Sequence, residues 1–241
     1  MATNRILIVG VGGLGVPALW ALARAGARQL TLVDPDPVEL SNLARQVIYR
    51  PLDIGLPKVE AAARWIAKRF PDVSVEQHAI DLDSSNAPRL IAGHSFVIDA
   101  TDSPVAKFLI NDTCIAARTP FVYGGVVGMT GQAMSVIPGE TACIRCVFEA
   151  PPDEDEIQSC REAGIVGPVA GAIGEMQAAE AMRAVRAQAL LLSGKILTYD
   201  ASGLSRVRMM EVSPRRECDC GAWKANRESQ PSREQMERGE R

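Results

Sequence analysis

The sequence carries little excess charge of either sign. Among 241 residues, 26 lysines and arginines stand against 29 aspartates and glutamates, which gives a formal net charge of −3. A nucleic-acid surface is usually strongly basic, so this balance argues against such a partner. At 47% hydrophobic and 23% charged residues, the chain suits one sizeable core. We expect one domain over residues 1–224 and a disordered polar tail over residues 225–241.

The sequence also lacks an apolar run suited to a membrane. Its longest uncharged stretch, residues 119–139, holds five glycines and two prolines, which a simple membrane helix tolerates poorly. The pattern of residues 5–9 is typical of a strand, and no small-residue cleavage site follows it, so no signal peptide is predicted. We therefore expect a cytoplasmic protein, whose six cysteines are thiols or metal ligands rather than disulfides.

What the sequence does contain is an alternation of short apolar runs with helical periods. Strands are predicted at residues 6–9, 29–33, 73–79, 95–99 and 121–123, and helices at residues 14–25, 57–70, 84–92 and 105–118. This repetition predicts a Rossmann-like, doubly wound α/β fold with a mostly parallel sheet. Strands at residues 132–137, 195–200 and 205–211 are expected to extend the sheet in antiparallel fashion. A helix is expected from Pro168 to about Leu192.

A glycine-rich turn follows the first predicted strand and opens the first helix. It comprises Gly10, Gly12, Gly13 and Gly15, and a bare backbone at a helix N-terminus is suited to phosphate groups. Asp34 ends the second strand, where a carboxylate accepts hydrogen bonds from a ribose. The pattern predicts a nucleotide site without distinguishing NAD, FAD, S-adenosylmethionine and ATP. A tight turn that binds nothing is the alternative.

The next crossover carries three residues that we interpret as a triphosphate clamp. Asn42 and Arg45 lie in the segment SNLARQ, and Pro57 predicts a helix start that puts Lys58 in the first turn. A cation there opposes the helix dipole, and a bound polyanion would reverse that penalty. The alternative is that Arg45 and Lys58 are two solvated surface cations.

Asp102 follows the strand at residues 95–99, at the edge of a doubly wound sheet where ligands bind. Its carboxylate is suited to Mg²⁺, which prefers oxygen ligands. The alternative is a helix cap by Asp102 or Ser103, with Pro104 as the first helical residue. Both interpretations can hold at once for neighbouring residues.

Four of the cysteines form two close pairs, Cys143 with Cys146 and Cys218 with Cys220. Two such pairs predict a structural zinc site, with redox motifs or free thiols as alternatives. Cys160 lies in a predicted loop beside Arg161, and a neighbouring cation can lower the pKa of a thiol. A loop cysteine without a role is the alternative.

Taken in order, these motifs resemble the ThiF/MoeB family, bacterial relatives of ubiquitin-activating enzymes, over residues 5–221. The most specific matches are residues 41–46, Lys58, Thr101-Asp102 and residues 160–164 followed by Gly167-Pro168. The resemblance implies ATP-dependent adenylation of the C-terminal glycine of a small ubiquitin-like sulfur carrier protein ending in Gly-Gly. Such carriers feed thiamine, molybdopterin or related sulfur pathways. A homodimer and a cysteine desulfurase as sulfur donor are also implied.

The same resemblance implies a role for each candidate residue. Gly12 and Asp34 would hold adenosine and ribose, while Asn42, Arg45 and Lys58 would hold the phosphates. Asp102 would help to bind Mg²⁺. The four paired cysteines would form a zinc knuckle, and Cys160 would lie on a crossover loop that some members use in a thioester or persulfide step. The absence of a histidine-centred base constellation agrees with this chemistry, because a carrier carboxylate is already ionised at neutral pH.

Three places depart from the family pattern. Only four residues precede Arg5, so the arginine with which family members reach a dimer partner's ATP site has no counterpart in this sequence. The usual Thr-Asp-Asn reads Thr101-Asp102-Ser103, and the second cysteine pair is Cys-x-Cys. Rival functions are an NAD- or FAD-dependent Rossmann oxidoreductase, a tRNA-modifying adenylating relative, and a catalytically weakened scaffold of the same family.

Overall fold

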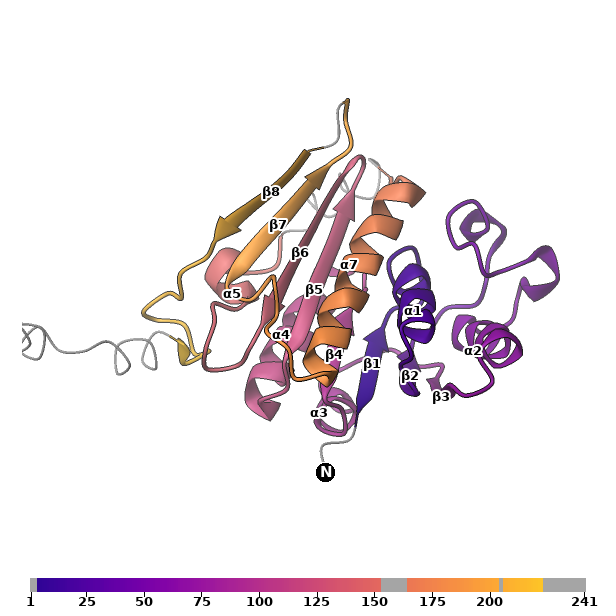
Figure 1. Ribbon diagram of the computed structural model, residues 1–241, viewed down its shortest axis with the longest axis horizontal. Helices are drawn as coiled ribbons and strands as arrows, with labels where there is room; N and C mark the ends of the chain where they lie inside the picture. The colour runs from indigo at the N-terminus through magenta and orange to yellow at the C-terminus, as the bar shows by residue number, and fades with distance from the viewer. Residues whose placement is uncertain (1–3, 153–163, 204–205, 223–241) are drawn as a thin grey trace, which may run out of the picture.

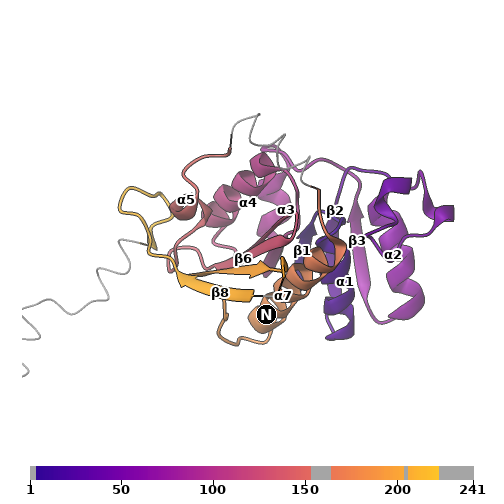
Figure 2. The ribbon, with the colours of Figure 1, turned by 90° about the horizontal axis from the view of Figure 1, so that it is seen from above.

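A single eight-stranded sheet organises the computed structural model, which describes residues 4–152, 164–203 and 206–222. The strand order is β3-β2-β1-β4-β5-β6-β7-β8. Strands β1 to β5 pair in parallel, and β6, β7 and β8 continue the sheet through antiparallel pairs. Helices lie on both faces (Figures 1 and 2). The predicted doubly wound fold with an antiparallel extension is therefore confirmed, while the tail predicted at residues 225–241 lies outside the described residues.

The elements have the following bounds. The strands are β1 (Arg5–Val9), β2 (Gln29–Val33), β3 (Ser74–His78), β4 (Phe96–Asp99), β5 (Phe121–Val127), β6 (Thr130–Val136), β7 (Lys195–Asp200) and β8 (Arg206–Glu211). The α-helices are α1 (Gly15–Arg24), α2 (Lys58–Arg69), α3 (Ala87–Ala92), α4 (Pro104–Ala117), α5 (Ile144–Val147) and α7 (Gly167–Val185). Two short 3₁₀ helices, η1 (Leu40–Asn42) and η2 (Pro51–Asp53), lie between β2 and α2.

Two apolar cores form because the sheet is covered on both faces. Side chains alternate along β1, so that Ile6 and Ile8 enter the core shared with α1, α2 and α7. Leu7 and Val9 enter the core shared with α3, α4 and α5. A strand buried on both faces reads as a continuous apolar run, which explains why β1 was predictable from its residues alone.

Strands β5 and β6 are longer than the expected segments 121–123 and 132–137, because helix α7 packs onto their glycines. A Cβ added at Gly124 would lie 2.4 Å from Gln177 Nε2, and one at Gly131 would lie 2.4 Å from Ile173 Cγ1. The glycines therefore admit the side chains of α7 rather than break the strands. The uncharged stretch noted in the sequence thus forms two adjacent strands of the sheet.

Helix α7 ends at Val185, seven residues before the expected end at Leu192. The buried carboxylate of Glu180 accepts hydrogen bonds from the backbone N–H groups of Leu191 and Leu192, at 3.0 and 2.9 Å. It also accepts one from the Ser135 hydroxyl at 2.7 Å. These bonds hold the chain after the helix against the sheet, and a helical continuation would break them.

The strand order reverses between β1 and β4, so the carboxyl ends of β1, β2 and β4 meet at one edge of the sheet. The turn after β1 touches the chain after β4, since a Cβ added at Gly10 would lie 2.6 Å from the carbonyl oxygen of Ala100. This edge brings the predicted nucleotide and magnesium residues into one region. No helix in the described part of the chain is long and apolar enough to cross a membrane.

Candidate functional site

The four glycines of the turn after β1 have two different roles. Gly10 has a φ of +91°, and a Cβ at Gly15 would lie 1.9 Å from the Gly10 carbonyl oxygen, so these two glycines make the tight turn possible. Added Cβ atoms at Gly12 and Gly13 would have their nearest neighbours at 3.5 and 3.6 Å, which is ordinary contact. Their lack of a side chain instead keeps the backbone accessible. Helix α1 begins here with no side-chain cap on its N-terminus, which suits an anion.

Asp34 lies beneath this turn at the end of β2 and is buried. Its Oδ2 accepts a hydrogen bond from the Val11 N–H at 2.6 Å, and its Oδ1 accepts one from the Asp36 N–H at 2.9 Å. Burial raises the pKa of Asp34, and the positive charge of Lys58 opposes that rise most strongly. Two backbone donors thus orient the carboxylate, which leaves further lone pairs as possible acceptors.

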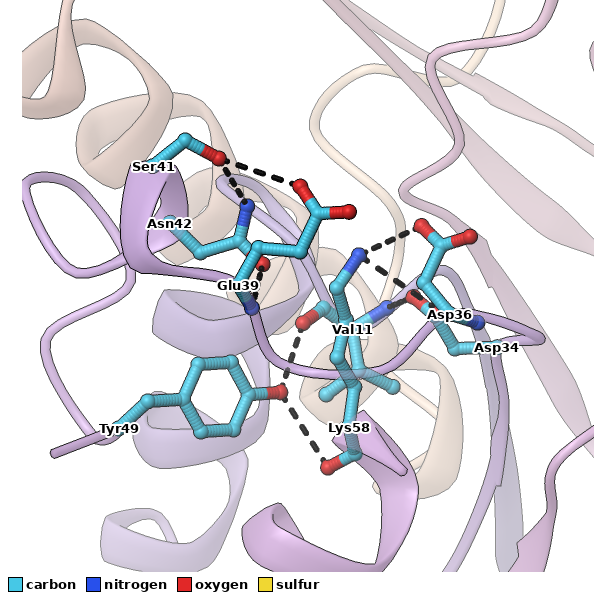
Figure 3. A network of polar contacts seen from close by, with 8 residues as sticks. All are labelled: Val11, Asp34, Asp36, Glu39, Ser41, Asn42, Tyr49 and Lys58. Carbon is cyan, nitrogen blue, oxygen red and sulfur yellow. Dashed lines mark hydrogen bonds and ion pairs between the residues drawn. The ribbon is translucent and has the colours of Figure 1, made fainter. Parts of the chain in front are cut away.

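Lys58 lies in the first turn of α2, as predicted, where it is the first helical residue, and its side chain is only 8% exposed. Figure 3 shows its ammonium group between two carboxylates. The Nζ atom lies 2.6 Å from Asp36 Oδ2 and 3.8 Å from Asp34 Oδ1. These carboxylates compensate for a cation at a helix N-terminus, which the dipole alone disfavours. Asp36 was not among the predicted site residues, although its place two residues after Asp34 puts it on the same loop.

Asn42 and Arg45 belong to the loop around η1. Asn42 is buried, and its Oδ1 accepts a hydrogen bond from the Glu39 N–H at 3.1 Å, so its side chain also shapes the loop. Arg45 donates from Nη1 to the Ser41 carbonyl oxygen at 3.0 Å. Its Cδ would lie 3.9 Å from a Cβ added at Gly13. The structure therefore places the Arg45 side chain against the glycine-rich turn.

Gln46 supplies a feature that the sequence analysis did not assign. Its side chain is 2% exposed, and its Nε2 would lie 3.5 Å from a Cβ added at Gly12. Its Oε1 is buried and has no hydrogen-bond partner among the described residues. A buried acceptor without a partner is costly, so it marks a place where a donor group of a ligand would be favourable.

The structure confirms a helix cap at residue 103, while a role of Asp102 in binding Mg²⁺ stays a prediction. The Ser103 hydroxyl oxygen caps α4 by accepting from the Ala106 N–H at 3.3 Å, with Pro104 as the first helical residue. Asp102 is exposed and makes no hydrogen bond or ion pair with another described residue. Its carboxylate is therefore free for a cation, and its oxygen chemistry fits Mg²⁺.

A buried ion pair beside Asp102 also escaped the sequence analysis. Lys107 Nζ lies 3.2 Å from both carboxylate oxygens of Asp99, at the end of β4. The same ammonium donates to the Gly124 carbonyl oxygen at 2.5 Å and lies 5.0 Å from the centre of the Tyr123 ring. The pair and this hydrogen bond connect the end of β4 and the middle of β5 to α4.

The four predicted metal ligands come together on the opposite side of the sheet from α1. The sulfur atoms of Cys143, Cys146, Cys218 and Cys220 all lie within 4.8 Å of one another. Three Sγ–Sγ distances are 4.0, 3.6 and 3.8 Å. A sulfur tetrahedron with Zn–S bonds of about 2.3 Å has edges of about 3.8 Å, so the cluster fits Zn²⁺ despite its Cys-x-Cys half.

Helix α4 holds this cluster in place. Asn111 is buried, and its Oδ1 accepts the Ile144 N–H at 2.9 Å in the turn between Cys143 and Cys146. Asp112 receives two hydrogen bonds from the Arg145 guanidinium, each at 2.7 Å. The contact between the Cys143 and Cys220 side chains lowers the pKa of Cys220 and raises that of Cys143.

Cys160, the predicted crossover-loop cysteine, lies outside the described residues. The chain re-enters the described part at Gly164, whose carbonyl oxygen accepts the Gly128 N–H at 2.9 Å in the turn between β5 and β6. A Cβ added at Gly167, the first residue of α7, would lie 3.3 Å from Arg45 Cβ. Gly167 thus lies beside Arg45, at the edge of the sheet that carries the candidate site.

Comparison with known proteins agrees with this arrangement. A model of the ThiF family matches residues 1–222. The chain belongs to the ThiF family. Its relatives include the SAMP-activating enzyme E1 of Haloferax volcanii, 38% identical over 85% of this chain and 76% of that protein. The adenylyltransferase and sulfurtransferase MOCS3 of Caenorhabditis briggsae is 37% identical over 89% of this chain and 54% of that protein, so the chain spans about half of its length. The predicted family is confirmed.

Two solved structures show a similar fold. The crystal structure of E. coli MccB with ATP matches with a TM-score of 0.78 at 22% identity, over 90% of this chain and 66% of that one. The structure of PaaA matches with a TM-score of 0.70 at 23% identity, over 86% of this chain and 64% of that one. At this identity the likeness concerns the fold alone, and the roles of individual residues rest on the geometry described above.

Proposed function

We propose that this ThiF-family chain adenylates the C-terminal glycine of a small ubiquitin-like sulfur carrier protein ending in Gly-Gly. The observation that carries the proposal is the position of Lys58. Its nearly buried ammonium group lies 3.8 Å from the Asp34 carboxylate, which itself accepts a hydrogen bond from the glycine-rich turn, and Arg45 lies against the same turn. Two cations next to free backbone donors favour a polyphosphate such as that of ATP.

The reaction requires positioning and positive charge rather than a base. The carrier's carboxylate oxygen attacks the α-phosphorus of ATP, the bond from that phosphorus to the bridging oxygen breaks, and pyrophosphate leaves with the electron pair. No proton moves, because the carboxylate is already ionised at neutral pH. The side chains of Arg45 and Lys58 would bind the phosphates and stabilise the charge that develops on them.

The remaining residues of the site would hold the nucleotide and its metal. Asp34 would accept hydrogen bonds from the ribose, while Gly10, Gly12, Gly13 and Gly15 would let the backbone approach it. Asn42 would bind phosphate through its amide group. Asp102 would ligate Mg²⁺, which supplies charge neutralisation for the departing pyrophosphate when bound.

The proposal extends to partners that the family suggests. The relatives are a SAMP-activating enzyme and an adenylyltransferase and sulfurtransferase, so a sulfur-carrying protein is the substrate class that we propose. Cys160 would act in a thioester or persulfide step after adenylation, with a cysteine desulfurase as sulfur donor. We propose a cytoplasmic homodimer serving thiamine, molybdopterin or related biosynthesis, with Zn²⁺ at the four cysteines as a structural clamp.

Exchange of labelled pyrophosphate into ATP, driven by the cognate carrier, tests the proposal. Lys58→Ala should lower exchange by about tenfold or more, because a preorganised charge contact is lost. Lys68→Ala, an exposed change on the same helix, should leave exchange intact. Cys160→Ala should also leave exchange intact and affect only the later covalent step. Loss of exchange in Cys160→Ala with normal exchange in Lys58→Ala would refute these roles.

A further inference from the structure

Tyr49 is a buried residue between the SNLARQ segment and helix α2 that none of the predicted motifs includes. Its side chain is 5% exposed. Its hydroxyl donates to the Val11 carbonyl oxygen at 2.9 Å and lies 3.3 Å from the Lys58 carbonyl oxygen (Figure 3). One carbonyl belongs to the glycine-rich turn and the other to the first residue of α2. A single hydroxyl therefore bridges the two elements that face the phosphates.

Both bridged residues are also held from a second direction. The Val11 N–H donates to Asp34, so the residue is fixed at its N–H by a carboxylate and at its C=O by the Tyr49 hydroxyl. The Lys58 N–H donates to the Asp36 carbonyl oxygen at 2.9 Å. The Asp36 carboxylate then holds the Lys58 ammonium. Turn, lysine and carboxylates thus form one connected network.

The hydroxyl is suited to this role because it remains a donor. Burial, followed by the negative charges of Asp34 and Asp53, raises the pKa of Tyr49 well above its ordinary value. A proton is therefore present at any pH at which the protein would work. A phenylalanine at this position would keep the ring in the core and leave the buried Val11 carbonyl without this donor.

We propose that Tyr49 is a positioning residue, which sets the distance between the glycine-rich turn and Lys58. It touches no substrate in this role and acts through the two backbone carbonyls. The inference rests on the proposed function in one respect, namely that the turn and Lys58 bind the phosphates of a nucleotide. Tyr49 extends that site beyond the residues that the family pattern suggests.

Binding of Mg²⁺-ATP, measured by calorimetry on the full chain, tests the proposal. Tyr49→Phe should raise the Kd by about fivefold or more, which corresponds to the loss of one hydrogen bond. Tyr199→Phe is the same chemical change on β7 and should leave the Kd unchanged. The deciding comparison is a double-mutant cycle with Lys58→Ala. If the hydroxyl positions the Lys58 ammonium group relative to the turn, then removing that side chain should reduce the effect of Tyr49→Phe to about twofold or less.

Two results would overturn the inference. One is an unchanged Kd in Tyr49→Phe, and the other is an undiminished effect in the Lys58→Ala background, which would assign Tyr49 to general stability. If Tyr49→Phe fails to fold, tyrosine-ring NMR of the wild-type chain replaces it. The Tyr49 signal should shift with Mg²⁺-ATP while that of Tyr199 stays, and a stationary Tyr49 signal would refute the role. A wild-type chain that binds ATP without catalysing exchange would refute the proposed function and leave this inference standing.

Discussion

Replacing Lys58 with alanine should destabilise the fold in a way that depends on pH. The ammonium group lies 3.8 Å from Asp34 Oδ1, and Asp34 is 5% exposed. Burial already raises the pKa of Asp34 from 3.8, and Lys58 is the strongest opposing influence. Without Lys58 that pKa should rise further, because a buried carboxylate would lose its nearest counter-charge.

The direction of this pH dependence follows from the protons that the folded and unfolded chains bind. A raised pKa means that the folded chain retains a proton at pH values where the unfolded chain has released it. The free energy of unfolding therefore falls as pH rises from the ordinary value of 3.8 to the pKa of the folded state. Because Lys58→Ala raises the folded-state pKa further, it extends this pH range to higher values. The variant should resemble the wild type near pH 4 and lose most stability at neutral and alkaline pH.

The magnitude can be bounded from the distances. Two unit charges about 4 Å apart interact by about 4 kcal/mol at an effective dielectric constant of about 20, and removing one partner of a buried pair costs about 3–5 kcal/mol. The Asp36 side chain is 61% exposed, so its pair with Lys58 adds only about 0–1 kcal/mol. We expect a loss of about 3 kcal/mol near pH 8 and below about 1 kcal/mol near pH 4.

Urea unfolding of the wild type, Lys58→Ala and Lys58→Ala/Asp34→Asn at these two pH values checks the prediction. The double variant removes the unpaired carboxylate, so it should recover most of the stability lost near pH 8. Lys68→Ala serves as the control for a lost lysine on the same helix. An equal loss at both pH values, or no recovery in the double variant, would show that Lys58 stabilises the fold by packing rather than by charge.

Two further predictions concern the nucleotide and the metal. Asp34→Ala should weaken Mg²⁺-ATP binding by about 1.5–3 kcal/mol for each hydrogen bond lost to the charged group, as measured by calorimetry, and an unchanged affinity would remove Asp34 from the site. Chelation should lower the melting temperature, because a metal at the four cysteines would join the α5 region to the chain near Cys218 and Cys220. Metal analysis that finds less than about half a zinc per chain, in protein purified without chelator, would contradict the zinc assignment.

Much of the local structure was determined by the sequence alone, because its causes lie within a few neighbouring residues. Gly10 permits a positive φ in the tight turn, Pro57 precedes the helix that starts at Lys58, and Ser103 with Pro104 begins α4. Each depends on steric limits or capping that residue type and spacing reveal. The pairing of two close cysteine motifs was also predictable, since their chemistry favours a shared metal.

Contacts between distant elements were decided only by the tertiary structure. The hydroxyl of Tyr49 reaches Val11, 38 residues away in sequence, because β1, the η1 loop and α2 meet at one sheet edge. The Lys107–Asp99 pair and the fit of α7 onto Gly124 likewise depend on strand order. Composition and periodicity specify which face of an element is apolar, but they leave open which neighbour it meets. Packing of the whole chain settles that question, because the folded arrangement buries both faces of the sheet and pairs buried charges such as Lys107 with Asp99.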